Sequence, residues 1–185
     1  IMLVVDCCIR GEESATRKYY RAYLEKAGIP AEEITVLDLS REEVASLDAD
    51  GLKRRDDLCA RKAFDDAMFA FARQFRDAEE ILIAAPFWDL SFPALLKSYL
   101  EQVCVTGLTF GYAEDGACVG YCRAKRLLYF STCGGFFGER NLGFEYVKAL
   151  AAMLGIETCV PYIAEGLDID PARRDEVLEQ AIAGL

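Results

Sequence analysis

Five short apolar segments alternate along the chain with longer segments of helical periodicity, and this alternation constrains the fold more than any other feature. The apolar segments are residues 2–5, 34–39, 80–86, 126–132 and 158–163. A chain that alternates strands and helices in this way forms a parallel sheet with helices packed on its faces. No internal repeat or low-complexity linker interrupts the pattern, so we expect a single domain over residues 1–185.

The segments between these strands carry helix signals. Ser14 is a suitable N-cap and Gly28 a suitable C-terminal stop for the helix between them. Pro93 and Pro171 suit the first turn of two later helices. The charged segment 53–78 predicts one long helix, because several apolar side chains fall on one helical face; they are Leu58, Met68, Phe71, Ala72 and Phe75.

Strand number and alternation together favour one topology. We expect an α/β protein with a flavodoxin-like, doubly wound, five-stranded parallel sheet in the order 2-1-3-4-5 and helices on both faces. In such sheets ligands bind beyond the carboxyl ends of the strands, between strands 1 and 3, where the strand order reverses. The loops after the first, third and fourth strands are therefore the candidate site.

The loop after the first strand reads DCCIRGEESAT and runs directly into a helix N-terminus. Ser14 and Thr16 offer hydroxyl groups there, and the first N–H groups of the helix are unpaired donors that suit a phosphate. The alternative is an ordinary serine N-cap with no ligand. The loop matches neither a P-loop nor the GxGxxG pattern of dinucleotide-binding proteins.

The loops after the third and fourth strands suit a flat ligand. Phe87 and Trp88 lie between two prolines in the stretch APFWDLSFP, so large aromatic side chains occupy a defined loop. A flavin ring would give them a flat partner, whereas the alternative is packing against a neighbouring helix or subunit. Gly134 and Gly135, in STCGG, let the backbone approach a ligand closely, although paired glycines also form plain turns.

Charge excludes two classes of partner. The chain has 31 acidic and 21 basic residues, a net charge of −10, and no basic run longer than KRR. Binding to nucleic acid or to an anionic membrane surface requires clustered lysine and arginine, so neither is expected. No segment approaches the length of a membrane span, and the opening IMLVV reads as a strand and not as a secretory signal.

Cysteine and histidine content bounds the chemistry. The chain has eight cysteines, no CxxC pair and no histidine. We therefore expect reduced thiols in the cytoplasm, and neither a disulfide framework nor a metal site. The usual general base and any Ser-His or Cys-His pair are also missing, so any chemistry must come largely from groups other than these.

With these residues in view, the sequence resembles the FMN-dependent NADH:quinone oxidoreductases of the azoreductase type, which are flavodoxin-like homodimers. The resemblance runs from the first strand to the last helix. Its most specific part is IAAPFWDLSFPALLKSYLEQVCVTGLTFGY, which is similar to the family's AP-aromatic-aromatic-Asn loop, LK pair and G-x-TF-x-Y strand. STCGG is similar to the family's TSRGG, and Ser14 to Thr16 to its phosphate-binding S-x-S.

The resemblance implies bound FMN, with NADH or NADPH as co-substrate. Phe110 and Tyr112 would lie near the site mouth and the dimer partner. The sequence departs from the family pattern in four respects: Asp89 replaces asparagine, Cys8 replaces serine, Cys133 replaces a basic residue, and the phosphate loop carries the acidic residues Glu12 and Glu13. The implied cofactor-binding residues are Cys8, Ser14, Ala15, Thr16, Phe87, Trp88, Asp89, Leu90, Thr132, Cys133, Gly134 and Gly135.

The resemblance also implies an activity. The protein would transfer two electrons from NAD(P)H to a quinone, an azo compound or a similar flat aromatic acceptor by a ping-pong mechanism, with no catalytic side chain because the flavin carries the chemistry. One alternative is an NADPH-dependent FMN reductase. Others are a flavodoxin-like FMN-binding electron carrier and a degenerate member without catalysis.

Overall fold

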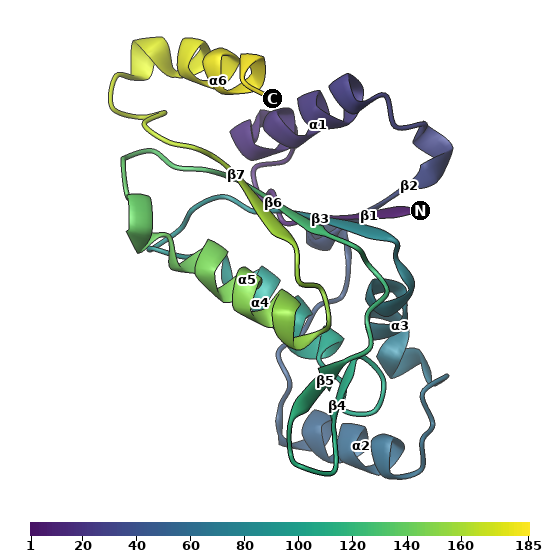
Figure 1. Cartoon of the computed structure of the whole chain (residues 1–185). Helices are drawn as coiled ribbons and strands as arrows, with labels where there is room; N and C mark the ends of the chain where they lie inside the picture. The colour runs from purple at the N-terminus through teal and green to yellow at the C-terminus, as the bar shows by residue number, and fades with distance from the viewer.

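The computed structural model describes residues 1–185 and contains one parallel sheet in the order β2-β1-β3-β6-β7. Renumbered over the sheet strands alone, this is the expected order 2-1-3-4-5, so the fold prediction is confirmed. Helices cover both faces (Figure 1), with α1 and α6 on one side and α4 and α5 on the other. The strands of the sheet are β1 Met2–Asp6, β2 Ile34–Asp38, β3 Glu80–Ala84, β6 Leu127–Thr132 and β7 Cys159–Ala164.

The helices fall between these strands as the alternation predicts. Ser14 accepts a hydrogen bond from the Arg17 N–H as the N-cap of α1, and Gly28 ends that helix at a φ of 64°. The six helices are α1 Ala15–Ala27, α2 Ala49–Ala60, α3 Ala70–Asp77, α4 Ala94–Val103, α5 Leu142–Met153 and α6 Arg174–Ala183. Six short 3-10 helices accompany them: Gly11–Glu13, Ala31–Glu33, Leu39–Arg41, Ala67–Phe69, Gly138–Arg140 and Pro171–Arg173.

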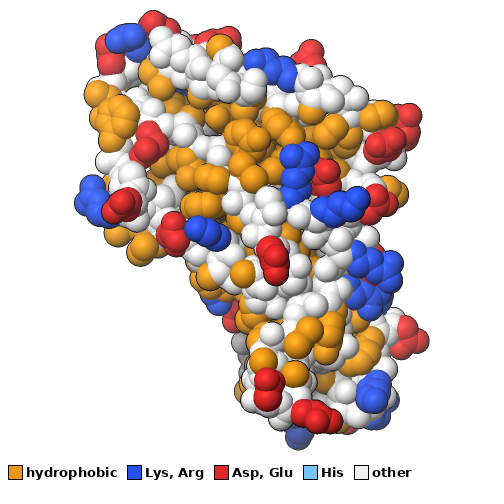
Figure 2. Space-filling model, in the orientation of Figure 1, with side chains coloured by type: hydrophobic (Ala, Val, Ile, Leu, Met, Phe, Trp, Pro, Cys, Tyr) orange, Lys and Arg blue, Asp and Glu red, His pale blue; other side chains and the backbone are white.

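The sheet is buried on both faces, and its central strands are apolar over most of their length. In β3, Ile81 and Ile83 pack with α3, α4 and α5, whereas Leu82 and Ala84 pack with α1 and α6. Such continuous apolar runs are typical of a parallel sheet between two helix layers. The strand order puts β7 at one edge of the sheet, and hydrophobic side chains gather over it in Figure 2.

The predicted long helix over residues 53–78 is wrong. The structure instead has α2 and α3, separated by a turn in which Lys62 takes a φ of 53°. The Asp66 side chain accepts a hydrogen bond from the Met68 N–H and so starts a new helical segment. Arg73 donates to the carbonyls of Phe64 and Asp66, both at 2.7 Å, and holds the turn closed. The apolar periodicity of the sequence continues across this break, whereas the break itself is made by the capping contacts.

A two-stranded hairpin, β4 Phe110–Tyr112 with β5 Cys118–Gly120, extends from the sheet beside α2 (Figure 1). The apolar alternation did not predict this hairpin as a unit, because its strands are only three residues long. Gly120 lies against the end of α5, where a Cβ atom would approach the Leu154 carbonyl carbon to 1.9 Å. No helix of the structure has the length and apolar character that crossing a bilayer requires.

Candidate functional site

A cavity of about 570 Å³ opens at the carboxyl ends of β1, β3 and β6, where the strand order reverses. Its volume lies within the range that holds a small organic ligand or cofactor. The lining residues come from four loops: Ile9, Arg10, Glu13, Ser14, Ala15, Thr16, Pro86, Phe87, Trp88, Thr132, Cys133, Gly134, Leu167, Asp168 and Arg174. The cavity is thus where the topology rule places a ligand.

The N-terminus of α1 forms one wall of this cavity. The Ser14 hydroxyl caps the Arg17 N–H, so the N–H groups of Ala15 and Thr16 remain without intrahelical partners. These donors and the positive end of the helix dipole make the wall a candidate anion site. Arg10 lines the cavity on the same loop and adds positive charge.

Loop contacts fix this wall relative to the sheet. The Thr16 Oγ1 lies 2.8 Å from the Thr132 Oγ1, which joins the first turn of α1 to the end of β6. Cys8 lies buried beneath the loop, and its Sγ contacts the Ala84 carbonyl oxygen at 3.8 Å. Burial, reinforced by the charge of Asp6, raises the pKa of the Cys8 thiol, so this side chain stays neutral. Cys8 therefore supports the anion site from below.

The aromatic loop after β3 is a tight turn. Trp88 and Ser91 exchange two backbone hydrogen bonds of 3.0 and 2.8 Å, and the two residues between them have positive φ, 52° at Asp89 and 68° at Leu90. This pair of left-handed residues is the geometry of a type I′ turn. Aspartate tolerates the left-handed conformation for the same reason as asparagine, so the replacement at position 89 preserves the turn.

The loop after β6 is bound to the loop after β7 by three backbone hydrogen bonds. The N–H groups of Gly166, Leu167 and Asp168 donate to the carbonyls of Gly135, Cys133 and Gly134, at 2.9, 3.1 and 2.9 Å. This pairing places Leu167 and Asp168 at the cavity, which Arg174, the first residue of α6, also lines. This fourth loop was not predicted from the sequence; its one signal is Gly166, the second residue after β7, which has a φ of 80°.

Glu165 extends this support to the aromatic loop. One of its carboxylate oxygens accepts hydrogen bonds from the Phe137 N–H at 2.6 Å and the Gly138 N–H at 3.1 Å. The Phe137 ring in turn lies on the Phe87 ring, with centroids 4.3 Å apart. Because Phe87 lines the cavity, Glu165 helps to set the position of an aromatic wall that it does not touch.

The charges around the cavity are balanced. Arg10 and Arg174 provide two positive charges and Glu13 and Asp168 two negative ones, with Arg174 paired to the Asp168 carboxylate. Cys133 adds no charge at neutral pH, because burial and the nearby Glu165 raise the pKa of its thiol to about 12. The structure contains no group of three or more histidine, cysteine or acidic side chains arranged to hold a metal ion.

The cavity gathers most of the residues singled out from the sequence. Eight of the twelve line it: Ser14, Ala15, Thr16, Phe87, Trp88, Thr132, Cys133 and Gly134. The other four, Cys8, Asp89, Leu90 and Gly135, lie beneath or beside it and shape its loops. Phe110 lies elsewhere, in a separate cavity between α2, α4 and α5, so within one chain the expectation that it lies near the site mouth is not met.

The sheet order and a cavity at the strand reversal, with a candidate anion site beside an aromatic wall, define a flavodoxin-like α/β protein. Residues 2–185 match a family model described as a flavodoxin-like fold. An FMN-dependent NADH:quinone oxidoreductase of Clostridium perfringens (strain ATCC 13124) is 32% identical over 186 residues, which cover 98% of this chain and 93% of that one. A protein of the same name from Xanthomonas oryzae pv. oryzae is 32% identical over 188 residues, which cover 100% of this chain and 94% of that one.

The fold is shared with solved structures. The crystal structure of an FMN-dependent NADH-azoreductase from Bacillus anthracis str. Ames Ancestor in complex with FMN matches with a TM-score of 0.82 and 22% identity, over 99% of this chain and 96% of that one. The chain belongs to the flavodoxin-like family that includes the FMN-dependent NADH:quinone oxidoreductases. The resemblance found in the sequence is thereby confirmed.

Proposed function

We propose that this protein binds FMN in the cavity and transfers two electrons from NADH to a flat aromatic acceptor such as a quinone or an azo compound. The observation that carries the proposal is the joining of a helix N-terminus, an aromatic turn and a glycine loop around one cavity at the strand reversal. Relatives over nearly the whole chain are named for this activity, which supports the same conclusion.

The donor set of the cavity fits FMN from end to end. The N–H groups of Ala15 and Thr16, with the Arg10 guanidinium, would hold the phosphate. Phe87 and Trp88 offer apolar ring faces to the isoalloxazine, and Gly134 lets the backbone come close to its polar edge. Bound FMN supplies the redox chemistry, and the protein supplies position and electrostatics.

The side chains of the site position and shield the cofactor. The Thr16–Thr132 contact fixes the phosphate wall relative to β6, and the turn at Trp88 fixes the aromatic wall relative to β3. Cys133 keeps its proton at neutral pH, so the loop beside the ring carries no thiolate charge. No protein acid or base is required, which agrees with a chain that has no histidine.

The exposed rim of the cavity suits a shared acceptor site. Trp88 lines the cavity and is 41% exposed. Beside it, Leu142 donates its N–H to the Leu90 carbonyl and is 54% exposed, and Phe136 packs its ring against Gly166 and is 69% exposed. We assign this apolar rim to binding of the flat acceptor and of the nicotinamide, and to contact with a second copy in a homodimer. A cytoplasmic location fits the eight free thiols.

Steady-state kinetics test the proposal. A single pocket used in turn by NADH and by a benzoquinone should give parallel double-reciprocal plots in the FMN-loaded protein. NADPH in place of NADH, and an azo dye in place of the quinone, would define the preferences. FMN binding without NADH oxidation would instead identify an electron carrier and overturn the proposed activity.

A further inference from the structure

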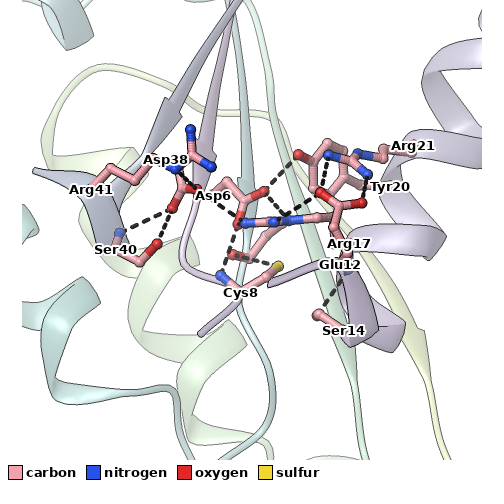
Figure 3. A network of polar contacts seen from close by, with 11 residues as sticks. Asp6, Cys8, Glu12, Ser14, Arg17, Tyr20, Arg21, Asp38, Ser40 and Arg41 are labelled. Atoms are coloured by element: carbon pink, nitrogen blue, oxygen red, sulfur yellow. Dashed lines mark hydrogen bonds and ion pairs between the residues drawn. The ribbon is translucent and has the colours of Figure 1, made fainter. Parts of the chain in front are cut away.

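Asp6, the last residue of β1, is the centre of a buried polar network that the proposed chemistry does not use (Figure 3). Its exposed fraction is 1% and that of Arg17, in the first turn of α1, is 6%. Burying a charged pair is unfavourable unless the geometry satisfies both partners, so such a pair calls for a structural or functional explanation.

The Asp6 carboxylate accepts four hydrogen bonds from two different parts of the site. Its Oδ1 accepts from the Cys8 N–H at 2.8 Å and from Arg17 Nη2 at 3.1 Å. Its Oδ2 accepts from Arg17 Nε at 2.8 Å and from the Tyr20 hydroxyl at 2.7 Å. One carboxylate therefore ties the start of the loop after β1 to the first two turns of α1, and the anion site lies between these points.

The Arg17 charge is directed away from the proposed phosphate position. Although burial lowers the pKa of Arg17, the hydrogen bonds and charge of Asp6 more than reverse this, and the guanidinium stays charged. It also contacts Asp38 and Glu12, each at 3.4 Å. A cation in the first turn of a helix opposes the helix dipole. Asp6 offsets this, so the network supplies geometry and little net positive charge.

We propose that Asp6 is a positioning residue that holds the loop of residues 7–14 against α1 in the conformation that binds the FMN phosphate. This role rests on the proposed function and deepens it. It separates the phosphate half of the site, which depends on Asp6, from the ring half, which depends on the aromatic and glycine loops. The loss of Asp6 should therefore weaken binding of FMN but not of riboflavin, which lacks the phosphate.

The test compares the dissociation constants of FMN and riboflavin, measured by quenching of flavin fluorescence on the purified chain. In Asp6→Asn the side chain keeps an oxygen for the Cys8 N–H but cannot accept all the bonds from Arg17 and Tyr20. We expect the FMN constant to rise about tenfold, whereas the riboflavin constant changes less than about twofold. Tyr20→Phe removes one donor and leaves the ion pair, so we expect a rise of about threefold for FMN alone.

Asp38→Asn is the matched control. It removes the same unit of charge from the same guanidinium but has no hydrogen bond to the loop of residues 7–14, so the ratio of the two constants should stay unchanged. Equal losses for FMN and riboflavin in Asp6→Asn would overturn the proposal, as would tighter FMN binding. If that variant does not fold, Tyr20→Phe decides by the same criterion. A wild-type protein that binds neither flavin would instead refute the proposed function.

Discussion

Asp89 offers the sharpest test of the aromatic turn, because its conformation and not its contacts should determine its effect. The side chain is exposed, and its backbone has a φ of 52°. A left-handed backbone costs an ordinary residue about 1–2 kcal/mol, and β-branched residues tolerate it least. Asp89→Val should therefore lower the free energy of unfolding by about 1–2 kcal/mol, and lower Tm by about 2–8 °C.

Two further variants at this position separate backbone from side chain. Asp89→Asn preserves the tolerance for positive φ and removes the charge, so stability should stay within about 0.5 kcal/mol of wild type. Asp89→Gly relieves the strain but adds entropy to the unfolded chain, so it too should be nearly neutral. Urea denaturation followed by circular dichroism measures all three.

The pattern among the variants decides the matter. Asp89→Val should destabilise the fold. It should also weaken FMN binding, because a change in the turn moves Trp88, which lines the cavity. Glycine and asparagine should do neither. Equal destabilisation by valine and glycine would show that side-chain contacts determine the effect, and the argument from the type I′ turn would be refuted.

Three other predictions concern the supports of the site. In a double-mutant cycle, Thr16→Val and Thr132→Val should show a coupling of about 1 kcal/mol in urea denaturation; additive losses would show that the 2.8 Å contact contributes nothing. Glu165→Ala should weaken flavin binding because the N–H groups of Phe137 and Gly138 lose their acceptor, whereas Glu165→Gln should retain most of the flavin affinity. Equal flavin affinities in Glu165→Ala and wild type would show that Glu165 does not support the site. Burial raises the pKa of the Cys7 and Cys133 thiols from 9.0 to about 12, so the folded state binds these protons more tightly than the unfolded chain does. The free energy of unfolding should therefore fall as pH rises from 9.0 toward 12. A free energy of unfolding that does not change with pH in that window would contradict the burial of these thiols.

The sheet and the helix ends were predictable because their signals are local. Apolar runs, the Ser14 cap and the Gly28 stop each depend on a few neighbouring residues, and the structure confirms them. The break between α2 and α3 was not predictable, since it depends on Arg73 reaching back to the carbonyls of Phe64 and Asp66. Helical periodicity alone contains no information about such contacts.

The candidate site also has a part that could be predicted from the sequence and a part that could not. Three of its loops were located from strand ends and motifs, because a parallel sheet brings these ends together. The loop after β7 was missed, since Leu167 and Asp168 reach the cavity only through backbone bonds to Cys133 and Gly134. Pairing between two loops cannot be read from either loop alone. The left-handed conformation of Leu90 also has no sequence signal, because leucine rarely adopts it.

The most direct test of the account is the visible spectrum of the purified protein, reconstituted with FMN and then mixed anaerobically with NADH. We expect a bound flavin spectrum that bleaches on addition of NADH and returns on addition of a quinone. A protein that binds no FMN at micromolar concentration, or whose bound FMN is not bleached by NADH, would contradict the proposed function.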